Sequence, residues 1–181
     1  MLQSITKLIV MVLLVTAFTS CNQGPTLQTY YVDNELKPGF MSFDAPTSLI
    51  NVEGVEMTDQ QRVAYNSVNK LNVLAYTLSD SNFKDYELEL EKIKLILKDT
   101  KYEELMRGSS GIDGKFVVKF LGDIDRIDEL IVFGNSKDKG FVIARILGDN
   151  MNAAQLMSLR TVLEDFKFED SQLNGMKEFF K

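Results

Sequence analysis

The chain has 181 residues, of which 45% are hydrophobic and 25% are charged, and its formal net charge is −6 at pH 7. This acidic balance argues against nucleic acid as a partner, because phosphate binding needs clustered lysine and arginine side chains. The chain contains no histidine and one cysteine, which excludes the usual His and Cys zinc sites and the Ser-His-Asp and Cys-His mechanisms. We therefore expect a protein that is not an enzyme and that has no bound cofactor.

The first residues have the parts of a secretory signal peptide. A positive charge at Lys7 precedes an apolar run from Leu8 to Phe18, and two small residues then lead to Cys21. A helix of this run reaches only about 16 Å, against roughly 30 Å for the hydrocarbon core of a membrane, so it is too short for a stable span. The stretch that ends at Cys21 resembles the bacterial lipobox, in which the cysteine receives diacylglycerol before the leader is removed.

These features predict three segments. Residues 1–20 form a lipoprotein signal peptide, residues 21–29 form a lipidated tether, and residues 30–181 form a single domain. Two or more acyl chains on Cys21 would hold the protein at a bilayer almost permanently. We expect a location in the cell envelope, anchored by this lipid on the periplasmic side of a bacterial membrane, with the membrane and another envelope protein as partners.

The chain after the tether predicts strands and helices in turn. Phe40 to Phe43 lies between two turn signals and predicts an edge strand. A capping box precedes a helix from Asp59 to Lys70, and Leu71 to Leu78 then alternates as a strand. A longer helix is then predicted by apolar residues that recur every three or four positions, namely Phe83, Tyr86, Leu90, Ile93 and Leu97. After this helix, Tyr102 to Arg107 adds another turn or two of helix.

Three strands then follow in quick succession, from Lys115 to Leu121, Glu129 to Gly134 and Gly140 to Leu147. Their connections are too short for a crossover helix, so we expect an antiparallel meander. Asn152 begins a covering helix, and residues 171–181 predict a short closing helix. The predicted fold is a single α+β domain in the order (β)αβαβββα. Its helices pack on a mainly antiparallel sheet made of the meander and one or two further strands.

The adjacent aromatic residues Tyr30 and Tyr31, just beyond the tether, have two interpretations. They contact the membrane interface or a partner, or they begin the fold and fill a groove. We favour the second interpretation, because such residues are mostly buried in ordinary domains.

Two groups of charged residues are candidate sites at opposite rims of the meander. The first group is an acidic turn, and we expect Asp149 to lie beside it. Together these residues would supply oxygen ligands for calcium, although a solvated turn without metal is the default interpretation. The aspartates of this turn are Asp123, Asp125 and Asp128. The other rim is a candidate contact surface for a partner. Its basic residues are Arg107, Lys115, Lys137 and Lys139.

Several stretches of the chain, besides the leader, resemble a known family. These stretches are Gly39–Pro46, Lys98–Met106, Asp128–Phe133 and Arg145–Met151. In them the chain resembles small lipoproteins of Bacteroidota grouped as domain of unknown function 4252. The resemblance covers most of the chain after Cys21. It implies an envelope location and a common fold, and it transfers no active site.

Three functions stay open at this point. The first is a non-catalytic interaction or sensing module that presents a surface to another envelope protein or to the bilayer. The second is an oxygen-ligand hydrolase, dependent on calcium or magnesium, that uses the four aspartates. The third is a carrier of a small apolar ligand held between sheet and helices, because the predicted strands are apolar on both faces.

Overall fold

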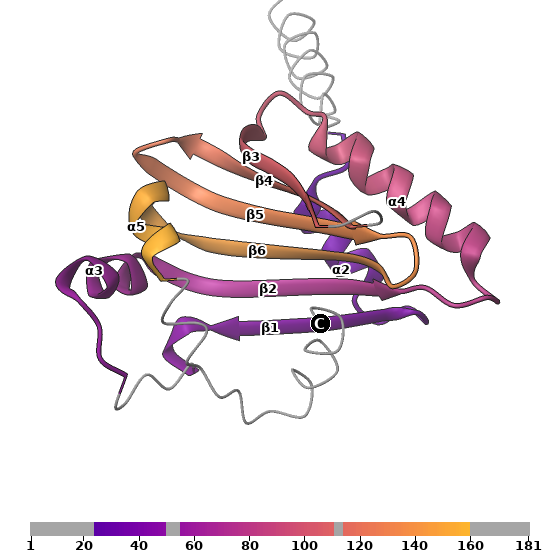
Figure 1. The fold of residues 1–181 in the computed structure, drawn as a ribbon, viewed down its shortest axis with the longest axis horizontal. Coiled ribbons are helices and arrows are strands. Elements are labelled where there is room, and N and C mark those ends of the chain that lie inside the picture. Colours follow the sequence, from indigo (N-terminus) through magenta and orange to yellow (C-terminus); the bar gives the residue numbers. More distant parts are fainter. Residues whose placement is uncertain (1–23, 50–54, 111–113, 160–181) are drawn as a thin grey trace, which may run out of the picture.

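The computed structural model describes residues 24–49, 55–110 and 114–159, which form a six-stranded antiparallel sheet with helices on both faces (Figure 1). The strands lie in the order β1-β2-β6-β5-β4-β3. Their bounds are Phe40–Pro46 (β1), Val68–Thr77 (β2), Glu103–Ser110 (β3), Gly114–Asp123 (β4), Arg126–Ser136 (β5) and Gly140–Met151 (β6). The α+β class and the antiparallel meander are therefore confirmed, and the meander has one strand more than predicted.

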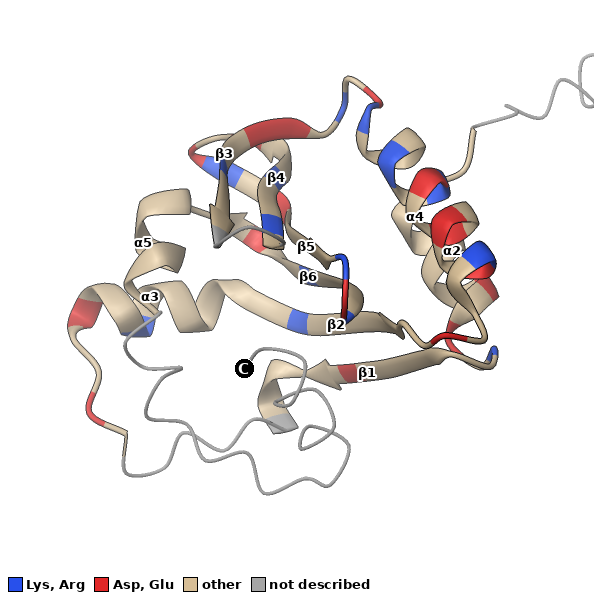
Figure 2. Cartoon of the chain, turned by 45° about the vertical axis from the view of Figure 1, so that its right-hand side comes forward, with Lys and Arg blue, Asp and Glu red and all other residues tan. Residues whose placement is uncertain are grey.

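The helices cover the two faces of the sheet in pairs. Helices α2 (Leu27–Asn34) and α4 (Phe83–Leu97) lie side by side on one face (Figure 2). Helix α5 (Ala153–Ser158) packs at one end of the opposite face, and α3 (Asp59–Ser67) packs against α5. A short 3-10 turn, η1 (Thr47–Leu49), follows β1. This arrangement agrees with strands that are apolar on both faces and need cover on both sides.

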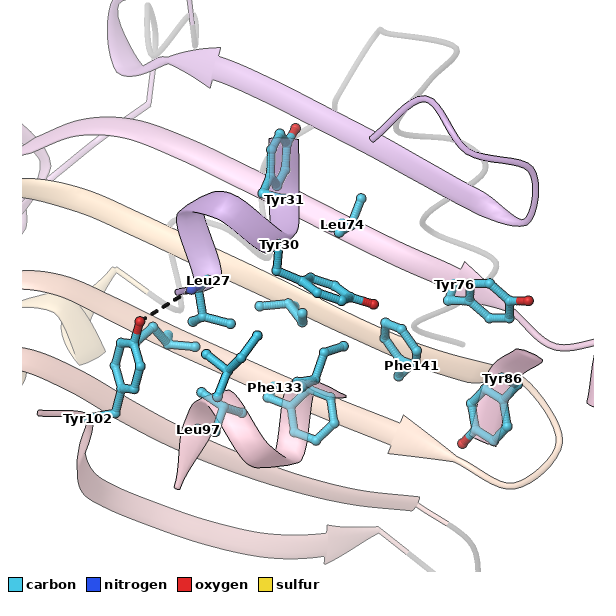
Figure 3. Close-up of a cluster of buried hydrophobic side chains, with 14 residues drawn as sticks. Leu27, Tyr30, Tyr31, Leu74, Tyr76, Tyr86, Leu97, Tyr102, Phe133 and Phe141 are labelled. Carbon is cyan, nitrogen blue, oxygen red and sulfur yellow. Dashed lines mark hydrogen bonds between the residues drawn. The ribbon is translucent and has the colours of Figure 1, made fainter. Parts of the chain in front are cut away.

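An aromatic cluster fills the space between the sheet and helices α2 and α4 (Figure 3). Phe141 of β6 is fully buried, and the centre of its ring lies 5.5 Å from that of Tyr76 and 6.1 Å from that of Tyr86. Phe40 meets Tyr76 edge-on, with ring centres 4.8 Å apart. These contacts bury large apolar surfaces in favourable ring geometries. The space directly beneath these two helices is thus filled by side chains of the core.

Helix α2 begins the fold inside the stretch predicted as tether. Thr26 and Thr29 form a reciprocal capping box at its start, and Leu27 is only 1% exposed. Tyr30 and Tyr31 are buried, which confirms that they begin the fold. The folded domain therefore already includes Leu27, inside the range 21–29 that was predicted as a tether. The helix was not predicted because its two aromatic residues are adjacent and give no helical period.

Three tyrosine hydroxyls connect α2 to the rest of the domain. The Tyr102 hydroxyl accepts a hydrogen bond from the N–H of the first residue of α2 (3.4 Å, Figure 3). Tyr30 donates to Glu89 of α4 (2.7 Å), and Tyr31 donates to the carbonyl of Phe43 in β1 (3.2 Å). Burial raises the pKa of Tyr30 and Tyr31, that of Tyr31 to about 12, and the Glu89 carboxylate raises the pKa of Tyr30 further.

The free energy of unfolding should fall as the pH rises above about 10, the pKa of tyrosine in an unfolded chain. Because the folded-state pKa values are raised, the contribution of Tyr30 and Tyr31 is complete below that pH and is lost as the pH passes through those values. Each tyrosine adds at most about 1.4 kcal/mol per pH unit to this decline. Urea unfolding across the alkaline range measures it. The Tyr30→Phe/Tyr31→Phe variant should show a shallower decline, and an equal decline would contradict the assignment.

Two elements differ from their predicted form. The segment predicted as helix from Tyr102 to Arg107 is instead the edge strand β3, which pairs with β4. Helix α3 ends at Ser67 rather than Lys70, because Val68 already pairs with β6. In both places pairing with a distant strand overrides the local helical spacing. The observed order is therefore αβαβαββββα, in place of (β)αβαβββα.

Helices α4 and α5 start where the sequence predicts. Helix α4 spans Phe83 to Leu97, the range of its apolar repeat. Helix α5 starts after Asn152, whose side chain accepts hydrogen bonds from the N–H groups of Ala154 and Gln155. The predicted signal peptide with Cys21, the predicted continuation of the covering helix beyond residue 159 and the predicted closing helix at 171–181 lie outside the described residues.

Candidate binding site

A groove of about 390 Å³ lies between α4 and the strands β3 and β4. Helix α4 packs through Ile93 and Leu97 into the same buried cluster as Phe133 of β5 and Phe141 of β6. Val117 of β4 is only partly buried at the margin of this cluster. The helix thus covers the middle of the sheet and leaves the neighbouring face of β3 and β4 open as the groove.

Strand alternation brings basic side chains of β3 and β4 to this open face. Arg107 pairs with Val117, which in turn pairs with Phe133 of the core beneath α4. Residues two positions apart on a strand point to the same face, so Lys115 and Lys119 share the side of Val117. On this face of β4, the basic side chains of Lys115 and Lys119 therefore lie on either side of the apolar side chain of Val117.

Five basic side chains stand along the two walls of the groove. They are Lys94 and Lys98 on α4, and Arg107, Lys115 and Lys119 on the strands. Figure 2 shows basic positions on both α4 and β4. Among the described residues that line the groove, Glu104 is the only acidic one. A chain with a net charge of −6 thus gathers positive charge at one place, which attracts anions.

Two of these basic groups are held in place by neighbours. Arg107 donates two hydrogen bonds to the carboxylate of Glu104, and this pairing holds the pKa of Glu104 below its usual range. Lys119 donates a hydrogen bond to the backbone carbonyl of Tyr102 (2.5 Å). Both groups therefore keep a fixed position along the strand wall while they still contribute positive charge.

Two other lysines form no ion pair within the described parts of the chain. Lys98 follows the last residue of α4, and Lys115 lies at the start of β4, and both are exposed. Lys94, by contrast, lies 3.3 Å from the carboxylate of Glu91. An anion that enters the groove can bind Lys98 and Lys115 without first displacing a protein carboxylate.

The floor of the groove is apolar. It includes the buried side chains of Leu97 and Phe133 and the half-buried side chain of Val117. The polar groups around it are mainly donors, from the basic residues and the amide of Asn135. The arrangement is therefore suited to binding.

The basic rim predicted from the sequence is partly the same site. Arg107 and Lys115 line the groove. Lys137 and Lys139 lie between β5 and β6, and the pairing of Gly114 with Ser136 places them at the same end of the sheet as the start of β4, as predicted. These two lysines are not among the described residues that line the groove.

Three basic residues of the groove were not predicted: Lys94, Lys98 and Lys119. The spacing of four residues between the first two is a signal for one helical face. Lys119 also continues an alternation with Lys115 along β4, around Val117. Both signals were present, but only the packing of α4 beside β4 joins them into one site.

The acidic rim does not form a metal site within the described residues. Its aspartates are Asp123, Asp125, Asp128 and Asp149. Asp149 accepts a hydrogen bond from Asn69 (2.7 Å), and Asp125 accepts one from Asn152 (3.3 Å). No group of three or more possible metal ligands comes together in the part of the chain that the structure covers.

A second hollow, of about 540 Å³, lies at the other end of β3 and β4. Its lining includes the acidic residues Glu103, Glu104 and Asp123 beside Phe120 and Ile124. The two hollows therefore differ in charge, and an anion would select the groove beside α4.

The fold and the groove define a small α+β domain whose candidate binding site lies between a helix and one margin of the sheet. The family model described as Domain of unknown function (DUF4252) matches residues 31–159, and the chain belongs to this family. The resemblance to domain of unknown function 4252 is thus confirmed, and the matched range contains all the described groove residues. No curated protein and no solved structure gives a significant match. Within the described ranges, no helix has the length and apolar character needed to cross a membrane.

Proposed function

We propose that this protein is a non-catalytic interaction module of the cell envelope, held at a membrane by lipid on Cys21, that binds its partner in the groove beside α4. The observation that carries the proposal is the set of five basic side chains over an apolar floor in an acidic chain. Concave sites with an apolar lining and a few convergent polar groups are typical of ligand binding. The partner is another component of the envelope.

A lipid on Cys21 would keep the groove near the bilayer. Helix α2 begins at Leu27, so only a few residues separate Cys21 from the folded domain. An extended chain spans at most about 3.5 Å per residue, which gives roughly 20 Å for this connection. A tether of this length confines the domain to the layer beside the membrane. It also raises the effective concentration of any partner in that membrane.

Photo-crosslinking in intact cells tests this proposal. With a photoreactive amino acid in place of Lys98, we expect an adduct in the membrane fraction. The Cys21→Ser variant, exported behind a leader that is cleaved without lipidation in place of residues 1–20, should move to the soluble fraction. Its adduct yield should fall by about tenfold or more, because the local concentration of partner is lost.

The matched control carries the same photoreactive amino acid in place of Lys84, which is exposed on α4 outside the groove. It should give little adduct. Equal yields at positions 84 and 98 would overturn the groove as the binding site. If the Cys21→Ser variant still fractionated with membranes after its exchanged leader had been removed, the lipid anchor would be overturned.

A further inference from the structure

We propose that the groove binds a single-chain anionic lipid, a molecule with one alkyl chain and one acidic head group. This inference rests on the proposed function and names the class of ligand that the same groove takes. The alkyl chain lies on Leu97, Val117 and Phe133, and the head group lies between Lys98 and Lys115.

The floor of the groove favours a ligand that has an apolar part. Val117 is half-buried and offers carbon surface that a small hydrated ion would leave unused, and Leu97 and Phe133, each 5% exposed, add the edges of their side chains. Each methylene group buried on such a surface strengthens binding by roughly fourfold. An alkyl chain therefore adds much more affinity here than the charge alone would give.

The walls of the groove select for a negative head group. Lys98 extends the helix wall and Lys115 belongs to the strand wall, and neither forms an ion pair within the described residues. Arg107 and Lys119 stay fixed by their own partners and add to the positive field. A carboxylate or phosphate head group would accept charge-assisted hydrogen bonds from the two unpaired lysines. A cationic head group would be repelled by all of them.

The size of the groove suits one chain. Its volume of about 390 Å³ lies near the lower end of the range of small-molecule sites. A site of this size holds the end of a single lipid rather than a patch of bilayer.

The sheet beneath the groove argues against an acidic peptide as the occupant. Strand β4 pairs with β3 on one side and with β5 on the other, so its backbone N–H and C=O groups are already hydrogen-bonded. A peptide laid on this floor would find few partners for its own backbone groups, and burying them unpaired is costly. An alkyl chain has no such groups to satisfy.

Calorimetric titration of the same Cys21→Ser variant, after removal of its exchanged leader, tests the ligand class, since this chain lacks both the apolar leader and the proposed lipid and needs no detergent. The probes are dodecyl phosphate, dodecyltrimethylammonium and inorganic phosphate, the first two below their critical micelle concentrations. Dodecyl phosphate should bind at least about tenfold more tightly than either of the others. It is the one probe of the three that has both an alkyl chain for the apolar floor and a negative charge for the basic walls.

Charge-reversal variants locate the head group. Lys98→Glu/Lys115→Glu should weaken dodecyl phosphate binding by about tenfold or more. Arg62→Glu/Lys84→Glu makes the same charge change at exposed positions outside the groove and should leave binding unchanged. The milder Lys98→Gln/Lys115→Gln variant should weaken binding in the same direction, which guards against misfolding of the Glu variant.

Matched valine variants locate the alkyl chain. Val117→Thr should weaken binding several-fold, because it places a hydroxyl in the floor. Val132→Thr makes the same change on the other face of the neighbouring strand and should leave binding unchanged.

Equal affinity for the anionic and cationic probes, or unchanged binding in the Lys98→Glu/Lys115→Glu variant, would overturn the inference. A protein adduct at position 98 together with no dodecyl phosphate binding would overturn the lipid and leave the interaction module standing. Loss of any adduct specific to position 98 would overturn the proposed function itself.

Discussion

Replacing Arg145 by methionine should lower the free energy of unfolding by about 3–5 kcal/mol, because it leaves the carboxylate of Glu129 buried without a counterion. Arg145 donates two hydrogen bonds to Glu129, from Nε to Oε1 (2.6 Å) and from Nη2 to Oε2 (3.1 Å). The two residues are only 4% and 8% exposed. A third bond, from Nη1 to Gln28 Oε1 (2.7 Å), joins the pair to α2. Urea unfolding followed by circular dichroism measures the loss.

The matched control is Lys70→Met. Lys70 lies 2.8 Å from Asp44, but their side chains are 44% and 38% exposed, so breaking this pair should cost no more than about 1 kcal/mol. Replacing both members of the buried pair, Arg145→Met with Glu129→Leu, should recover most of the lost stability, because no buried charge then stays unpaired. Equal losses for Arg145→Met and Lys70→Met would contradict the role given to burial.

Replacing Gly140 by alanine should lower the free energy of unfolding by more than about 3 kcal/mol. Gly140 opens β6 with a φ of +115°, a backbone conformation that side-chain-bearing residues rarely adopt. A Cβ at this position would lie 1.9 Å from the carbonyl oxygen of Tyr76. The backbone cannot move aside freely, because Gly140 pairs with both β2 and β5. The next residue, Phe141, is the centre of the aromatic cluster, so a shift here would also disturb the core.

Gly134→Ala is the control for this prediction. Gly134 lies in β5 of the same sheet, and a Cβ there would meet its nearest neighbour, Val142, at an ordinary 3.6 Å. Alanine at this position should change the free energy of unfolding by no more than about 1 kcal/mol. Comparable losses for the two variants in urea unfolding would show that strain at Gly140 is not the cause.

The elements that could be predicted from the sequence are those in which the spacing of the apolar residues matches the sides that are buried in the structure. Helix α4 has an apolar repeat along its whole length, because one side of it is buried against the sheet. The strands of the meander are apolar on both faces and are joined by short connections, which leaves an antiparallel arrangement as the simple solution.

Other elements depend on neighbours that the local sequence does not reveal. Strand β3 contains Arg107, Gly108 and Ser109 and has no clear alternation, and it is extended because β4 offers it hydrogen-bond partners. Helix α2 is short, and its stability comes from Leu27 and the two tyrosines buried against strands far along the chain.

The candidate site was predicted only in part for the same reason. Arg107 and Lys115 were recognised as basic residues at one rim. Their partner across the groove, Lys98, belongs to a helix whose position beside β4 follows from core packing through Leu97 and Phe133. A spacing rule describes one element at a time, whereas this groove is formed by the gap between two.

Tyr102 forms hydrogen bonds both to the first residue of α2 and to a lysine on the wall of the groove. Its hydroxyl accepts a hydrogen bond from Leu27, the residue at which the N-terminal chain enters the fold, and its carbonyl accepts one from Lys119 on the groove wall. One residue thus contacts both the start of α2 and a wall of the groove, beside the hydrogen bonds by which Tyr30 and Tyr31 also hold this helix. A substitution that displaced Tyr102 would therefore disturb both the first turn of α2 and the position of the Lys119 ammonium group.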